Sequence, residues 1–133
     1  MTRKNQRWAK LLTLEVWVYL AEHPFVFTKR DLPAELFSKI ERLRGHCPLC
    51  EIFDSDGNNG PCPRCPLDKA GELCRLPYSA FASWASANTE QGKHLSAEKI
   101  VAIVKAWTPY GMKPGEGNET RYKESLKEAD DGK

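Results

Sequence analysis

The chain lacks the features that would assign it at once to a common class. It has only three histidines among 133 residues. It contains no Gly-rich phosphate loop, serine nucleophile elbow or HExxH helix. The apolar stretch 11–21 is interrupted by Glu15 and is shorter than the roughly 20 residues that span a bilayer. The start of the chain does not resemble a signal peptide. We therefore expect a cytoplasmic protein outside the membrane.

The charges are nearly balanced, so the overall composition does not indicate a nucleic-acid partner. Twenty basic and 18 acidic residues give a formal net charge of +2. Residues 1–46 carry nine basic and five acidic groups, a surplus of +4, whereas residues 47–78 carry three and five, a balance of −2. Basic runs are mostly solvated surface, but they can also contact phosphates. The candidate phosphate contacts are Arg3, Lys4, Arg7, Lys10, Lys39, Arg42, Arg44 and Arg64.

Five closely spaced cysteines are the most specific feature of the chain. Residues 47–50 read CPLC and residues 62–65 read CPRC. A Cys-x2-Cys turn brings two thiolates to one point, and two such turns complete a tetrahedron around a soft metal. Paired cysteines in a reducing cytosol bind metal more often than they form disulfides. The sequence thus predicts a structural zinc site from four of Cys47, Cys50, Cys62, Cys65 and Cys74.

Neither the ligand set nor the metal is fixed by this spacing. The simplest set uses both CxxC pairs and leaves Cys74 as a small buried residue. In the alternative set, Cys74 replaces Cys62. An iron–sulfur cluster also takes four thiolates, so an iron–sulfur or redox sensor is a further alternative.

A metal enclosed by four thiolates has no open position for a water molecule, which indicates a structural and not a catalytic site. Residues 61–65 match the PCxxC half of a nucleobase deaminase, but the chain has no upstream His-x-Glu. Residues 54–60 are rich in Asp and Asn, yet the Gly and Glu positions of a calcium loop are not met. We predict that the protein is not an enzyme.

The apolar pattern predicts a mainly α-helical fold. Residues 13–22 fit a buried helix better than a strand, although apolar residues also alternate there. Further helices are expected over residues 31–45, capped by Asp31, over residues 77–87, and over residues 96–107, capped by Ser96. His94 is expected in a polar loop before the last helix.

The expected organisation is a small helical domain with an inserted Cys-rich zinc-knuckle loop and a disordered tail. Residues 1–10 form a basic N-terminal segment, residues 11–112 the single domain with its metal module at 45–76, and residues 113–133 the charged disordered tail. The apolar residues of the metal module form either a small core or a contact patch. They are Leu49, Ile52, Phe53 and Leu67.

The strings CPLC and CxxCPL, followed by Cys74, Tyr78 and Trp84, resemble small five-cysteine proteins of bacteriophages and prophages. This resemblance covers about residues 12–107 and implies a phage accessory protein in the cytoplasm of a bacterial host. The recurrence of Cys74 in that pattern favours a metal role for it. We predict a non-enzymatic protein that binds a host or phage protein and so inhibits a host process. The alternative is a zinc-dependent nucleic-acid-binding or transcription-regulating module.

Overall fold

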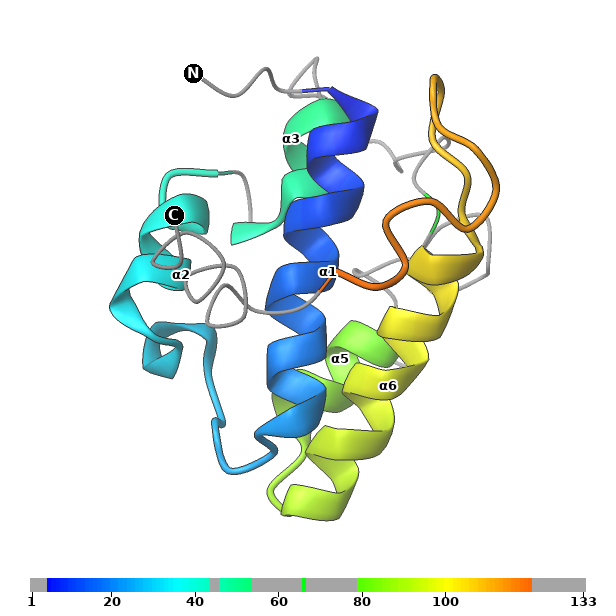
Figure 1. Cartoon of the computed structure of the whole chain (residues 1–133). Helices are drawn as coiled ribbons and strands as arrows, with labels where there is room; N and C mark the ends of the chain where they lie inside the picture. The colour runs from blue at the N-terminus through cyan, green and yellow to red at the C-terminus, as the bar shows by residue number, and fades with distance from the viewer. Residues whose placement is uncertain (1–4, 44–45, 54–65, 67–78, 121–133) are drawn as a thin grey trace, which may run out of the picture.

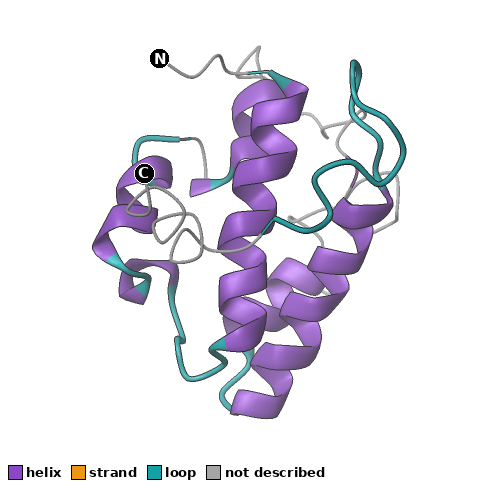
Figure 2. Cartoon of the chain, in the orientation of Figure 1, coloured by secondary structure: helices purple, strands orange, loops and turns teal. Residues whose placement is uncertain are grey.

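The computed structural model describes residues 5–43, 46–53, 66 and 79–120, and within them the fold is helical with no strand. The long helices α1 (Gln6–Glu22) and α6 (Glu90–Ala106) lie side by side, with α5 (Ala80–Ser86) packed on α6 (Figures 1 and 2). The short helices α2 (Ala34–Ile40) and α3 (Pro48–Phe53) lie on the other side of α1. The predicted mainly α-helical fold is confirmed. None of the described helices is long and apolar enough to cross a membrane.

Helix α1 confirms the helical interpretation of residues 13–22 and begins earlier than expected. The side chain of Asn5 caps it by accepting a hydrogen bond from the backbone N–H of Trp8 at 2.9 Å. Half of the basic segment 1–10 therefore belongs to the helix. Residues 12–18 are all buried. Helices α3 and α6 cover different sides of α1 (Figure 1), so apolar residues occur around most of this helix. This is why its sequence shows the alternation typical of a strand as well as helical spacing.

Two predictions about the last helix are wrong. The N-cap of α6 is Thr89, whose hydroxyl accepts a hydrogen bond from the Gly92 N–H at 3.1 Å, and Ser96 lies inside the helix. The polar composition of residues 88–95 indicated a loop, but a Thr cap followed by Glu90 is a good helix start. His94 therefore lies in α6. Its Nδ1 atom is 2.7 Å from the carbonyl oxygen of Ala21 in α1.

The single helix predicted from Asp31 to residue 45 is wrong at both ends. Asp31 belongs to the 3-10 turn η1 (Lys29–Asp31), and its carboxylate accepts a hydrogen bond from the Thr28 hydroxyl at 2.9 Å. Leu32 precedes a proline and takes an extended ψ of 157°, which separates η1 from α2. Pro33 is the N-cap of α2, which ends at Ile40.

Helix α5 lies within the predicted 77–87 segment and joins α1 through aromatic rings. The Trp17 ring meets those of Trp84 and Phe81 edge to face, at centroid distances of 5.1 and 6.2 Å.

The ammonium group of Lys93 lies 4.2 Å from the Trp84 ring centroid. It donates to the carbonyl oxygens of Trp84 at 2.6 Å and Phe27 at 2.8 Å. Lys93 thus ties α6 to the last turn of α5.

The segment after α6 returns to α1 through successive turns. Gly117 has a φ of +85°, and a Cβ atom there would meet the Leu11 side chain at 2.9 Å. Another residue here would have to adopt a left-handed φ and displace the Leu11 methyl group, so glycine suits this turn. The disordered tail predicted from residue 113 is wrong for residues 113–120, which form turns against α1. Residues 121–133 lie outside the described residues.

Candidate functional site

The first predicted cysteine knuckle lies at the start of α3. Cys47 directly precedes this helix and is 8% exposed, and Cys50 lies in its first turn. Pro48 and Leu49, between the two cysteines, are fully buried. Helix α3 itself packs against α1 (Figure 1). The knuckle is therefore attached to the core of the fold and is not carried on an exposed loop.

The backbone turn before Cys47 is held by contacts from other elements. His46 has a φ of +53°, a left-handed conformation that is uncommon for residues other than glycine. Its carbonyl oxygen accepts a hydrogen bond from the Lys29 ammonium at 3.2 Å, and its ring meets that of Phe37 edge to face at 5.4 Å. The same ammonium lies over two aromatic rings of the core. These contacts fix the direction in which the chain reaches the knuckle.

Three predicted ligands, Cys62, Cys65 and Cys74, lie outside the described residues, as does the side chain of Cys50. In the part of the chain that the structure describes, no group of three or more His, Cys, Asp or Glu residues could hold a metal. A four-thiolate site at Cys47 thus requires cysteines from beyond α3. The burial of Cys47 fits such a site because structural zinc sites are closed to water.

Of the two alternatives left open for the apolar residues of the metal module, the contact patch is wrong for Leu49. This side chain is fully buried in the main core, and Ile52 is half-buried against the same core. The side chain of Phe53 and all of Leu67 lie outside the described residues. The two described members therefore favour a small core over an exposed patch.

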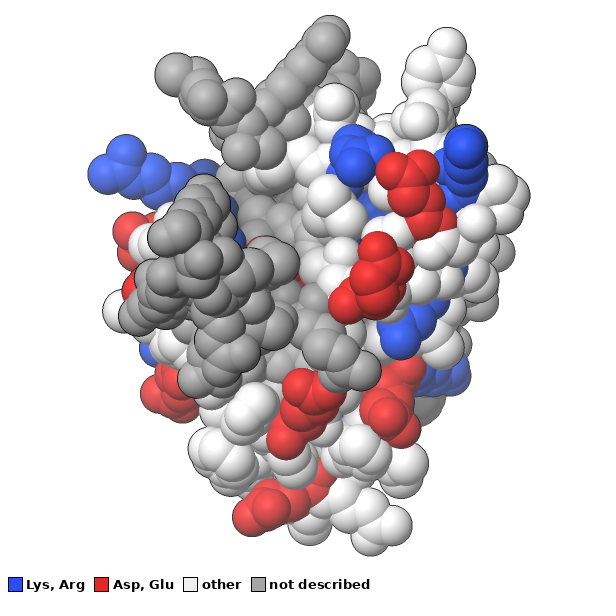
Figure 3. Space-filling model, in the orientation of Figure 1, with Lys and Arg blue, Asp and Glu red and all other residues white. Residues whose placement is uncertain are grey.

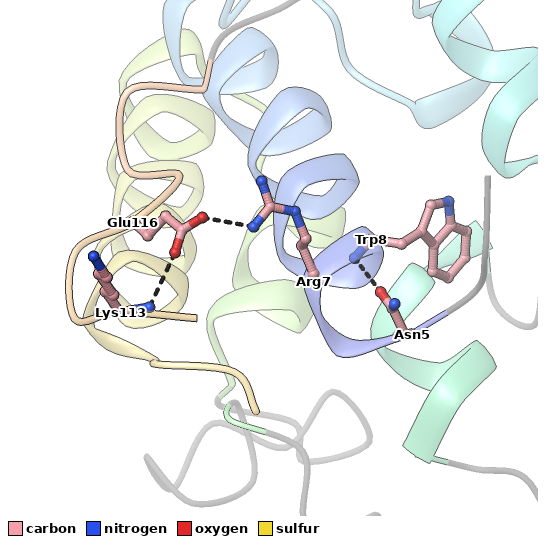
Figure 4. Close-up of polar contacts among 5 residues, drawn as sticks. All are labelled: Asn5, Arg7, Trp8, Lys113 and Glu116. Atoms are coloured by element: carbon pink, nitrogen blue, oxygen red, sulfur yellow. Dashed lines mark hydrogen bonds and ion pairs between the residues drawn. The ribbon is translucent and has the colours of Figure 1, made fainter. Parts of the chain in front are cut away.

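Arg7, one of the predicted phosphate contacts, is paired with an acidic residue of the fold. Its guanidinium donates to Glu116 Oε2 at 2.6 Å, and Glu116 Oε1 accepts a hydrogen bond from the backbone N–H of Lys113 at 3.0 Å (Figure 4). The Lys113 hydrogen bond, and after it the one from Arg7, lowers the pKa of Glu116 below its ordinary value. The pair connects the start of α1 to the segment after α6.

We expect Glu116→Gln to destabilise the fold at neutral pH and to have little effect in acid. Because the folded-state pKa of Glu116 is lowered, the unfolded chain binds the proton first as the pH falls below the ordinary value of 4.5. The stabilisation is then lost as the pH falls through the folded pKa. Urea unfolding of both proteins at about pH 7 and about pH 3 measures this, with the exposed Glu119→Gln as control. An undiminished difference in acid would contradict the expectation.

Lys39 is also paired with an acidic residue, whereas Arg42 has no such partner in the described part of the chain. Lys39 donates to Glu15 Oε1 at 2.9 Å, and the Glu15 side chain is only 9% exposed. Arg42 is exposed and has no ion-pair or hydrogen-bond partner among the described residues. Figure 3 shows acidic and basic side chains interleaved on the face drawn, without a continuous basic field. Of the remaining candidates, Arg3, Lys4, Arg44 and Arg64 lie outside the described residues.

The predicted phosphate contact of Lys10 is wrong. Lys10 is fully buried, and its ammonium donates to the carbonyl oxygen of Trp107, at 2.8 Å, just beyond the end of α6. Burial removes water from the ammonium groups of Lys10 and Lys93 and lowers the pKa of each. Both lysines hydrogen-bond carbonyl oxygens at the C-terminal ends of helices, which favour positive charge. Sequence reasoning missed this role because a lysine in a polar run is usually solvated.

A surface groove of about 480 Å³ lies between α1 and the end of α2. No prediction from the sequence identified it, because it depends on how these two helices are placed. It is lined by Trp8, Leu11, Leu12, Glu15, Lys39, Arg42 and Leu43. A smaller cleft of about 330 Å³ lies beside His46, and Arg30 and Trp84 are among its lining residues. The groove combines apolar walls with charged side chains, as binding sites for proteins do.

Comparison with known proteins does not assign the chain to a family. No protein-family model, curated protein or solved structure matches the chain. The resemblance to five-cysteine phage proteins therefore stays a prediction. The residues of the chain itself have to support any functional conclusion.

Proposed function

We propose that this chain is a non-enzymatic accessory protein of phage type that acts by binding a host or phage protein. Four of its five cysteines hold one zinc ion, whose role is structural. The observation that carries this proposal is the position of Cys47, buried at the start of a helix that packs on α1. A zinc ion at this point would stabilise the attachment of the cysteine segment to the core.

The ion pairs favour a protein partner over a nucleic acid. Affinity for nucleic acid comes largely from Lys and Arg side chains that neutralise phosphates. Of the candidate contacts in the described part of the chain, Arg7 and Lys39 already neutralise acidic side chains, and Lys10 is buried. Arg42 is the exposed cation that remains of this set. A surface of mixed charge is suited to a protein partner of complementary pattern.

We expect the purified protein to bind DNA and RNA weakly and with little dependence on salt. Fluorescence anisotropy with labelled oligonucleotides, repeated at several salt concentrations, measures the slope of the logarithm of the association constant against the logarithm of salt concentration. Among the described candidate contacts Arg42 alone is exposed and unpaired, and one phosphate contact corresponds to a slope of about −1. A slope of about −4 or steeper would contradict the protein-binding proposal and favour the nucleic-acid alternative.

A further inference from the structure

We propose that the groove between α1 and α2 binds an amphipathic helical segment of a partner protein that carries a carboxylate. This inference rests on the proposed function and adds the site and the chemistry of the partner. The groove is flanked by helices, and the described chain has no strand whose edge could pair with an extended peptide. Recognition of a helix in an apolar groove is the mode that such a surface supports.

The apolar part of the groove determines what enters it. Trp8 and Leu11 are half-buried, and Leu12 and Leu43 behind them are buried. Figure 4 shows Trp8 extending from the side of α1 opposite the Arg7–Glu116 pair. A volume of about 480 Å³ lies within the range of roughly 300–1,000 Å³ that small-molecule clefts have, so it can receive a few side chains of a partner. Apolar side chains three or four positions apart on a partner helix would cover Trp8 and Leu11 together.

The charged part of the groove determines which charge the partner segment should carry. Its lining contains two cations, Lys39 and Arg42, and one carboxylate, Glu15, which leaves a surplus of one positive charge. Lys39 and Glu15 bind each other at 2.9 Å, which leaves the exposed Arg42 to pair with an incoming carboxylate. Arginine forms two parallel hydrogen bonds to a carboxylate, and Trp and Arg are frequent hot spots of interfaces. An acidic amphipathic helix therefore complements both parts of the groove.

A display selection tests the proposal with the full chain as bait and a library of randomised helical peptides as the probe. We expect the enriched peptides to share apolar residues three or four positions apart next to Asp or Glu. Arg42→Glu should weaken their binding by at least about tenfold, and Trp8→Ala by about thirtyfold or more. Arg30→Glu is the matched control, because it reverses the charge of an exposed arginine in the other cleft. It should change binding less than about twofold.

Three results would overturn the proposal. If the enriched peptides bind Arg42→Glu and Trp8→Ala as they bind the unaltered chain, they bind elsewhere, and the groove is wrong while protein binding stands. If a synthetic peptide of residues 121–133 displaces them, the occupant of the groove is the C-terminal end of this chain. If no peptide is enriched and the salt slope for nucleic acid is steep, the proposed function fails as well. Because Arg42 is exposed, its substitution leaves the fold intact and keeps the test decisive.

Discussion

Cys47→Ser is expected to release the proposed zinc ion and to lower the free energy of unfolding by more than about 3 kcal/mol. Structural zinc contributes an apparent binding free energy of roughly 10–16 kcal/mol in small zinc-finger peptides, so losing one ligand removes a large part of the folding energy. Cys47 is 8% exposed and directly precedes α3. Elemental analysis measures the metal, and hydrogen exchange over residues 46–53 measures the loosening of α3.

The substitution also places a hydroxyl in apolar surroundings, and this cost has to be separated from the loss of metal. Removing the metal with a chelator from both proteins gives the packing cost alone, which we expect to be about 1 kcal/mol. The stability difference between the two proteins measured with zinc, minus the difference measured after chelation, is the contribution of metal binding through Cys47. Equal stability of the unaltered chain and Cys47→Ser in the presence of zinc would contradict a structural site. Cys62→Ser and Cys74→Ser then identify the fourth ligand, because a variant that keeps its metal has lost a residue that does not bind it.

Lys93→Met is expected to destabilise the fold by about 2–4 kcal/mol, because it removes a buried hydrogen-bond donor. Methionine keeps most of the length of the side chain but removes the donor. The carbonyl oxygens of Trp84 and Phe27 then lose hydrogen bonds of 2.6 and 2.8 Å in a site where the lysine is 1% exposed. The contact of the ammonium with the Trp84 ring is lost as well. Urea unfolding measures the change.

Two further measurements test whether the loss of stability comes from the buried ammonium group of Lys93. Gln91→Met introduces methionine at an exposed position of the same helix and should change stability by no more than about 0.5 kcal/mol. The second is the pH dependence: burial lowers the folded-state pKa of Lys93, so at alkaline pH the unfolded chain binds more protons. The advantage of the unaltered chain over Lys93→Met should therefore grow as the pH rises towards 10.5. A destabilisation below about 1 kcal/mol would show that Lys93 does not tie α5 to α6.

Whether a segment is a helix or a strand could be predicted from the sequence where the tertiary packing agrees with the local apolar pattern. Residues 13–18, 20 and 21 are buried, so their apolar content indicated a central element, and the predicted helix is confirmed. The predicted N-caps were wrong where more than one polar residue could serve as the cap. Thr89 and Ser96 are both suitable N-caps, and the packing of α6 along α1 favours the longer helix. Asp31 looked like a cap, but the proline two residues later separates its turn from α2.

The candidate site was predictable only in part, because a sequence motif names ligands without saying what surrounds them. The CPLC string indicated a knuckle, and the structure places its first cysteine against the core, at the start of α3. The roles of the basic residues depend on partners that are distant in the chain. Glu116 lies far from Arg7 in sequence, and the carbonyl oxygen of Trp107 far from Lys10. The groove beside Trp8 likewise exists only because α1 and α2 are brought together.

Metal content tests the central claim most directly. The protein is purified without oxygen, and elemental analysis is performed together with a visible absorption spectrum. The account predicts one zinc ion per chain and no colour, as four thiolates around zinc require. Iron with visible absorption would instead indicate a thiolate-ligated cluster and favour the redox sensor. The structural site would be contradicted altogether if the protein contained no metal. It would also be contradicted if a chelator left the cooperativity and stability of unfolding unchanged.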